Sequence, residues 1–346
     1  IFPGGAAISS EARLVRSPEG EAFRLALATP RHAVMEITGE LKPGADRLRG
    51  AWKLDLNSAD LAPLALGLPL PVFRARGEGE LEVDPAATAP RVEGWIALEV
   101  SGLEVLRPEL KALGALTIRS EFDAGWRAGV VRVGRLSAHV VGPHPIADLE
   151  VGQPFTVDLA RQEWAPADPG SDFARLRLEG VPTGWIAPWL GDLTVEGADW
   201  TGAIVASVSG GGLAVRTAGE VRAGGLALSH GAERILQGME VSLAGSASTV
   251  SGGWQARVDR LGLRASGQEL ATLEARLGRL AGADQPVKAE GALRLNLAEA
   301  VRQPAAAGRL AIAGGEANLK FGATLGTSRL VQAEVRLDRL RGGRPA

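Results

Sequence analysis

The sequence contains no cysteine and no tyrosine, and only 4% of its 346 residues are aromatic. Without cysteine the chain cannot form disulfides, thiolate zinc sites, iron–sulfur clusters or a thiol nucleophile. The 38 basic and 40 acidic residues leave a formal net charge of −2, which argues against nucleic acid as a partner. No run of about 18 apolar residues is present, so the sequence predicts no membrane-spanning helix.

Recognised catalytic motifs are also missing. The sequence has no G-x-x-x-x-G-K-[ST], no G-x-S-x-G, no H-E-x-x-H and no G-x-G-x-x-G. His139 and His144 are close in sequence, but a metal site would need further ligands, so we interpret them as turn and strand-end residues. Glu99 and Asp123 are interpreted as solvated strand residues rather than a glycosidase pair. The sequence therefore predicts no enzymatic activity, no catalytic or metal-binding residue and no cofactor.

What the sequence does contain is alternation of apolar with polar or small residues. In the segment 92–100, for example, Ile96, Leu98 and Val100 alternate with Trp95, Ala97 and Glu99. Such a period of two gives a strand one apolar and one polar face. About 22 such runs are separated by Gly, Pro, Asp or Asn, which is the spacing of an all-β chain.

Four segments depart from the alternation and predict short helices, each followed by a new strand. They cover residues 58–66, 104–113, 184–190 and 297–303. Proline is tolerated in a first helical turn but blocks extension, which keeps such helices short. The recurring order of short helix, Pro, Leu and a strand entered near a Gly is a degenerate internal repeat.

These units resemble the bacterial AsmA/TamB-like superfamily of periplasmic proteins. The stretch Asn57 to Asp84 carries the resemblance best, with Asn-Ser-Ala-Asp-Leu-Ala-Pro-Leu before a strand that contains Arg-Gly-Glu-Gly-Glu-Leu. The resemblance implies an elongated β-groove, likened to a folded taco, whose apolar interior carries lipid acyl chains between the inner and outer membranes. The N-terminal membrane anchor and the C-terminal module of that family are not recognisable in residues 1–346, and we expect any such segment to lie outside this sequence.

The alternation by itself points toward a similar architecture. An open sheet of this size with one apolar face must close, stack on another sheet, or curl so that the apolar face lines a groove. A closed membrane barrel needs aromatic girdles, which the low aromatic content disfavours. A parallel β-helix would need a more regular short repeat. We therefore predict an all-β fold, an elongated antiparallel β-meander curled into a groove, with a few short connector helices.

We interpret residues 1–346 as a single extended unit with a candidate soft joint at 163–170, where Trp-Ala-Pro-Ala-Asp-Pro-Gly interrupts the alternation. The chain starts at Ile1 without a charged and then apolar leader, so we expect it to be a processed chain or a fragment of a longer one. We expect it in the periplasm, tethered to the inner membrane by a segment outside this sequence.

The leading hypothesis is a non-enzymatic envelope protein that holds or conducts lipid acyl chains, with phospholipid or another lipid as partner and membrane proteins as candidate partners at its ends. A structural or scaffolding component of an envelope assembly is the alternative, and a carbohydrate-active β-solenoid is disfavoured. The candidate groove-lining residues alternate with polar or small neighbours: Ile96, Leu98, Val100, Leu116, Ile118, Val131, Val133, Leu293 and Leu295.

Overall fold

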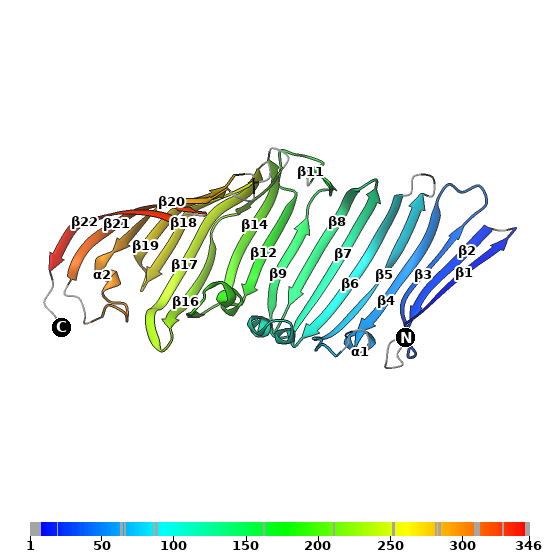
Figure 1. Cartoon of the computed structure of the whole chain (residues 1–346), viewed down its shortest axis with the longest axis horizontal. Coiled ribbons are helices and arrows are strands. Elements are labelled where there is room, and N and C mark those ends of the chain that lie inside the picture. The colour runs from blue at the N-terminus through cyan, green and yellow to red at the C-terminus, as the bar shows by residue number, and fades with distance from the viewer. Residues whose placement is uncertain are drawn as a thin grey trace. The chain divides into compact units, whose positions relative to one another are not determined.

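The computed structural model describes residues 8–342 except 19, 63–64, 66, 85, 87–88, 162, 210–211, 251–252, 281, 283–284, 308–311 and 327–328. Strands account for 71% of the chain and helices for 7%, which confirms the predicted all-β antiparallel meander (Figure 1). The chain divides into unit 1 (Ile1–Asp168) and unit 2 (Pro169–Ala346). This boundary falls within the 163–170 segment, and a soft joint there stays a prediction.

Unit 1 is an antiparallel sheet in which β1 to β8 pair in chain order. β8 then pairs with β9 along one half and with β10 along the other, and β10 pairs with β11. The strands are β1 (Ser9–Ser17), β2 (Gly20–Ala28), β3 (Ala33–Leu41), β4 (Leu48–Asn57), β5 (Val72–Asp84), β6 (Ala89–Ser101), β7 (Leu116–Arg127), β8 (Val130–Val141), β9 (Pro145–Val151), β10 (Phe155–Asp158) and β11 (Glu163–Pro166).

Unit 2 is also antiparallel, and its last seven strands pair in chain order. At its start β14 pairs with β12 and β15, while β13 pairs with β16. The strands are β12 (Ala174–Val181), β13 (Leu193–Glu196), β14 (Trp200–Ser209), β15 (Gly212–Thr217), β16 (Val221–His230), β17 (Glu233–Val250), β18 (Gly253–Ala265), β19 (Gln268–Arg279), β20 (Val287–Asn296), β21 (Ile312–Leu325) and β22 (Arg329–Gly342).

The four predicted connectors are short helices, as expected, and none of their described residues forms a strand. They are α1 (Ser58–Leu61), the 3-10 helices η1 (Leu103–Val105), η2 (Pro108–Leu113) and η3 (Thr183–Trp189), and α2 (Leu297–Ala300). Residues 63–64 and 66 of the first connector lie outside the described residues. Pro108 occupies the start of η2, where its missing N–H costs no helical hydrogen bond. In each unit these helices lie where the strands end on one side of the sheet, and we call this row of strand ends the helix edge. The row of strand ends on the opposite side is the turn edge (Figure 1).

The two α-helices begin in the same way, although one belongs to each unit. The Asn57 side chain accepts a hydrogen bond from the Ala59 N–H, and the Asp60 carboxylate accepts one from the Asn57 N–H. At α2 the Asn296 side chain accepts from the N–H groups of Ala298 and Glu299. Asparagine caps of this kind satisfy the first free N–H groups of a helix, so each strand ends in a defined turn.

Side chains of opposite character occupy the two faces of each sheet. The strand register places Trp52, Leu54, Leu98, Ile118 and their equivalents on one face. From β3 to β8 this apolar face of unit 1 carries no charged side chain. The alternate positions form a polar face that is rich in Arg and Glu, as the period of two predicts.

Candidate functional site

Seven of the nine predicted groove residues lie on the apolar face of unit 1. Leu98 is directly opposite Ile118, and Val100 is opposite Leu116. Val131 and Val133 follow on β8, beyond a register shift that returns them to the same face as Ala124. Six of the seven are half-buried, whereas Leu116, at the helix edge, is only 7% exposed. They are Ile96, Leu98, Val100, Leu116, Ile118, Val131 and Val133.

The other two predicted residues, Leu293 and Leu295, lie on the apolar face of unit 2. They are opposite Leu273 and Ala271 of β19. Both are half-buried and pack against a buried cluster that includes Met239. That cluster closes the helix edge of unit 2, and it comprises Ala223, Leu226, Met239, Ala265, Leu270 and Ala271.

An aromatic pair lies across the apolar face of unit 1. Trp52 of β4 stacks on Phe122 of β7, with ring centroids 5.9 Å apart, although two strands separate β4 from β7. The intervening positions are Gly79 and Gly94, which are opposite one another. A Cβ at Gly94 would lie 2.8 Å from the Trp52 ring, so the ring fits only over glycine. The Trp52 indole N–H donates to the Glu93 carbonyl at 3.2 Å, which fixes the ring on this face.

The apolar faces are only partly covered by protein. The accessible surface of the chain is 21659 Å². A compact globular protein of 35.9 kDa would expose about 13,000 Å², and two compact proteins of half that mass about 16,000 Å² together. The accessible surface exceeds both reference values, whether the chain is compared with one compact protein or with two. Side chains such as Leu98 and Ile118 would be fully buried in a filled sandwich core, but here they remain half-buried.

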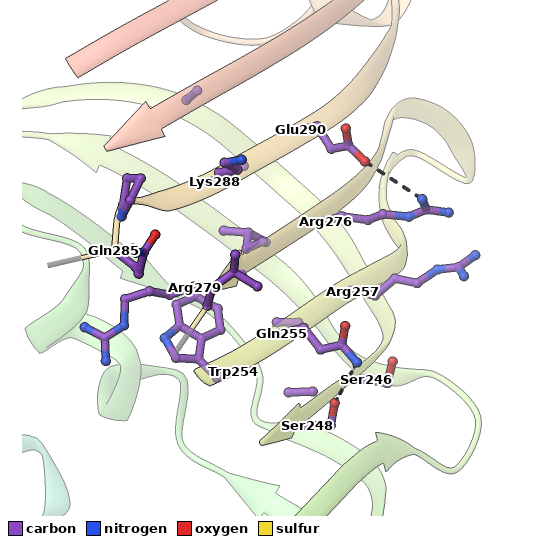
Figure 2. A pocket seen from close by; sticks show the side chains of 18 of the residues that line it. Ser246, Ser248, Trp254, Gln255, Arg257, Arg276, Arg279, Gln285, Lys288 and Glu290 are labelled. Carbon is purple, nitrogen blue, oxygen red and sulfur yellow. Dashed lines mark hydrogen bonds and ion pairs between the residues drawn. The ribbon is translucent and has the colours of Figure 1, made fainter. Parts of the chain in front are cut away.

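Unit 2 contains a groove of about 1460 Å³ toward its turn edge. Residues of β14, β15 and β17 to β22 line it, among them Trp254 and Leu277. This volume exceeds the ~300–1,000 Å³ of ordinary small-molecule pockets. Trp254, Arg279 and Gln285 lie together, whereas the side chains of Arg276 and Glu290 point away from them (Figure 2). Strand positions of both faces line this groove. Ala256 and Leu277 belong to the apolar face, whereas Arg257, Arg276 and Lys288 belong to the polar face.

The polar face of unit 1 carries cross-strand ion pairs. Arg91 contacts Asp123 at 2.8 Å, and Arg74 contacts Asp55 at 3.0 Å. The hydrogen bond from Arg91 holds the pKa of Asp123 below its ordinary value, against the opposing effect of partial burial. The hydrogen bond from Arg74 lowers the pKa of Asp55 in the same way. Asp123 is therefore an ion-paired surface carboxylate, consistent with its interpretation as a strand residue.

The histidines singled out in the sequence have structural contacts. His139 pairs through Nδ1 with the Asp148 carboxylate across β8 and β9, and His144 Nδ1 lies 3.0 Å from the Pro145 carbonyl oxygen. Among the residues that the structure describes, no group of three or more His, Asp and Glu side chains is placed to hold a metal ion. No helix within the described ranges is long and apolar enough to cross a membrane.

The prediction from sequence missed several residues of the apolar faces. Leu54, Leu81 and Phe122 belong to the same face as Ile118, and their alternation could have identified them. Arg279 was also missed. It occupies an apolar position of the β19 alternation, after Leu273 and Leu277, and a charge in that position was the available signal.

The chain matches no protein-family model, no curated protein and no solved structure in the three comparisons.

Proposed function

We propose that this protein is a non-enzymatic component of the bacterial cell envelope that holds or conducts lipid acyl chains along the apolar faces of its sheets. The observation that supports this proposal best is the apolar face from β3 to β8. It is free of charge, and most of its large side chains are only half-buried, with Trp52 and Leu116 as buried exceptions. The resemblance of the connector units to periplasmic AsmA/TamB-like proteins supports the same function. In this proposal the chain lies in the periplasm, tethered to the inner membrane by a segment outside this sequence.

The mechanism is partition. Each acyl CH₂ removed from water contributes ~0.8 kcal/mol, so an apolar face holds a chain without specific polar contacts. Neighbouring positions such as Leu98, Ile118 and Val140 are chemically alike and directly adjacent across the strands. Movement of a chain from one strand to the next therefore changes its free energy little. The charged polar face keeps the sheet itself hydrated while lipid occupies the other face.

A photo-crosslinking amino acid at positions 98 and 118, in living cells, tests this proposal. We expect phospholipid to be captured at both positions and not at 99 or 119, because the register places these on the polar face. Mass spectrometry of lipids that co-purify with the chain would identify the species. Equal capture on the two faces, or no capture by a correctly folded protein, would contradict the proposal.

One observation favours a structural or scaffolding role as a second candidate. Within the described residues, β21 is the one strand that pairs with β22, so the other side of β22 is an open sheet edge. Val331 and Val335 on its apolar face are 67% and 65% exposed. Exposed sheet edges accept partner strands. A scaffold of this kind would be supported if crosslinkers at 331 and 335 captured protein while positions 98 and 118 captured no lipid.

A further inference from the structure

Arg279 is placed unlike the other basic residues of its sheet. On β19 the apolar face is formed by Ala271, Leu273, Ala275 and Leu277, and the next position on that face is Arg279. Its cross-strand neighbour is Trp254 of β18. Arg279 is the single charged side chain among the apolar-face positions that pair between β18, β19 and β20. It marks the point where the apolar face reaches the turn edge.

Arg279 also has no acidic partner within the described part of the chain, in contrast to Arg257 and Arg260 on the polar face. Arg257 pairs with Asp259 at 2.6 Å, and Arg260 pairs with Glu269 at 2.8 Å. The Arg279 side chain is half-buried, and its Nε is buried without a hydrogen-bond partner. A buried donor that stays unsatisfied is costly, and because the residue as a whole is only half-buried, an acceptor from outside the chain can still approach its guanidinium.

The surroundings of Arg279 suit one kind of acceptor. Arg279, Trp254 and Gln285 lie together in the lining of the groove of about 1460 Å³, which polar-face residues such as Arg276 also line (Figure 2). A guanidinium binds phosphate through two parallel hydrogen bonds, and Gln285 adds an amide donor. A tryptophan suits a boundary between polar and apolar surroundings, because its ring is apolar and its N–H is polar.

The apolar face below this point is long enough for an acyl chain. Residues 271–279 of β19 extend over about 26 Å at ~3.3 Å per residue. One leaflet contributes about 15 Å to a hydrocarbon core of ~30 Å. A lipid whose phosphate lies at Arg279 can therefore place its acyl chains along Leu277 and Leu273 before it reaches the buried cluster at the helix edge.

We propose that Arg279, Trp254 and Gln285 form a subsite for the phosphate of a phospholipid headgroup, with the acyl chains directed from the turn edge toward the helix edge of unit 2. This inference rests on the proposed function and adds an orientation and a substrate class to it. The subsite makes unit 2 a place where a lipid pauses, because the headgroup contact is absent from the uniform apolar face of unit 1.

The experiment measures uptake of two fluorescent lipids by the full chain from vesicles of digalactosyldiacylglycerol, a bilayer lipid without phosphate. One lipid is phosphatidylglycerol, and the other is a diacylglycerol with the same chains and no phosphate. We expect Arg279→Gln to reduce phosphatidylglycerol uptake about tenfold, the effect of one charge-assisted hydrogen-bond pair, and to leave diacylglycerol uptake unchanged. Arg279→Lys should restore part of the uptake. Arg294→Gln, on the polar face of β20, is the matched control and should change neither.

Three results would overturn the inference. Equal loss of both lipids in Arg279→Gln would show that Arg279 only supports the fold. Unchanged phosphatidylglycerol uptake would show that the headgroup binds elsewhere. Competition by inorganic phosphate as effective as that by phosphatidylglycerol would assign a simple anion site. If the unmodified protein takes up neither lipid, the proposed function itself fails, and this outcome is distinct from loss of the headgroup preference alone.

Discussion

An acidic side chain in the middle of the apolar face of unit 1 distinguishes a lipid-lined face from a protein-filled core. Ile118 lies between Leu98 and Val140 on the neighbouring strands and is half-buried. Full burial of such a side chain is worth ~1.5–3 kcal/mol, so Ile118→Glu forfeits about 1–2 kcal/mol of apolar contact. A carboxylate that still reaches water adds about 1–2 kcal/mol for partial desolvation. The expected loss in the free energy of unfolding is therefore about 2–4 kcal/mol.

A folded variant is expected, since domains of ordinary stability tolerate a loss of this size. Urea unfolding followed by tryptophan fluorescence measures the loss, and lipid mass spectrometry measures the cargo. We expect Ile118→Glu to remain folded while it retains much less co-purified lipid. Ala97→Glu is the matched control, because its carboxylate would lie on the polar face directly between Arg76 and Arg119. It should change stability by no more than about 0.5 kcal/mol and leave the lipid unchanged.

The reasoning would be refuted if Ile118→Glu failed to fold at all while Ala97→Glu folded normally. A charge at position 118 would then be fully desolvated, which requires a second protein layer over the apolar face. Normal lipid content in a folded Ile118→Glu protein would equally contradict the proposed function.

Three further substitutions test particular contacts. Gly94→Ala should lower the free energy of unfolding by about 2–3 kcal/mol, because Gly94 has a φ of 152° and a Cβ would lie 2.7 Å from the Gly79 Cα; a thermal shift below about 2 °C would contradict this. Asn296→Ala should cost about 1 kcal/mol in urea unfolding through loss of the α2 cap, and Asn296→Ser should recover most of it. Asp123 has a lowered pKa in the folded state, so its carboxylate stabilises the fold above its unfolded pKa and this contribution is lost as pH falls through the folded value. Because Arg91 is half-exposed, the pair contributes only ~0.5–1 kcal/mol, and Asp123→Asn should lose that much less free energy of unfolding than the unmodified protein between neutral pH and about pH 2. Identical pH profiles of the free energy of unfolding for the two proteins would count against the pair.

The fold could be predicted from the sequence because its signal is local. Alternation at 92–100 and 116–124 places Leu98 and Ile118 on one face whatever the rest of the chain does. The connector helices were predictable for the same reason, since proline and the strand that follows limit each of them. Register between strands is not local, and the Trp52–Phe122 stack depends on the alignment of four strands at once.

The environment of each candidate residue was less predictable than its face. Leu116 and Leu295 alternate as regularly as Leu98, yet the first is buried at a helix edge and the second packs on a buried cluster. The residues of that cluster come from four strands, β16 to β19, and alternation within one strand does not describe how several strands pack together. Arg279 is the opposite case. Its charge at an apolar position of the alternation is visible in the sequence, but only the structure places it opposite Trp254 and in the lining of the groove.

Over the described ranges, each strand of a unit contacts mainly the strands to which it is hydrogen-bonded, and some strands also contact a short helix. Such an arrangement behaves like a one-dimensional array, in which stability accumulates from nearest-neighbour terms. Hairpins could then be inserted or lost during evolution without disturbing the remainder, so that chain length alone adjusts the extent of the sheet. Opening should begin at outer strands such as β1 and spread inward hairpin by hairpin, so a partly unfolded molecule keeps an intact central sheet.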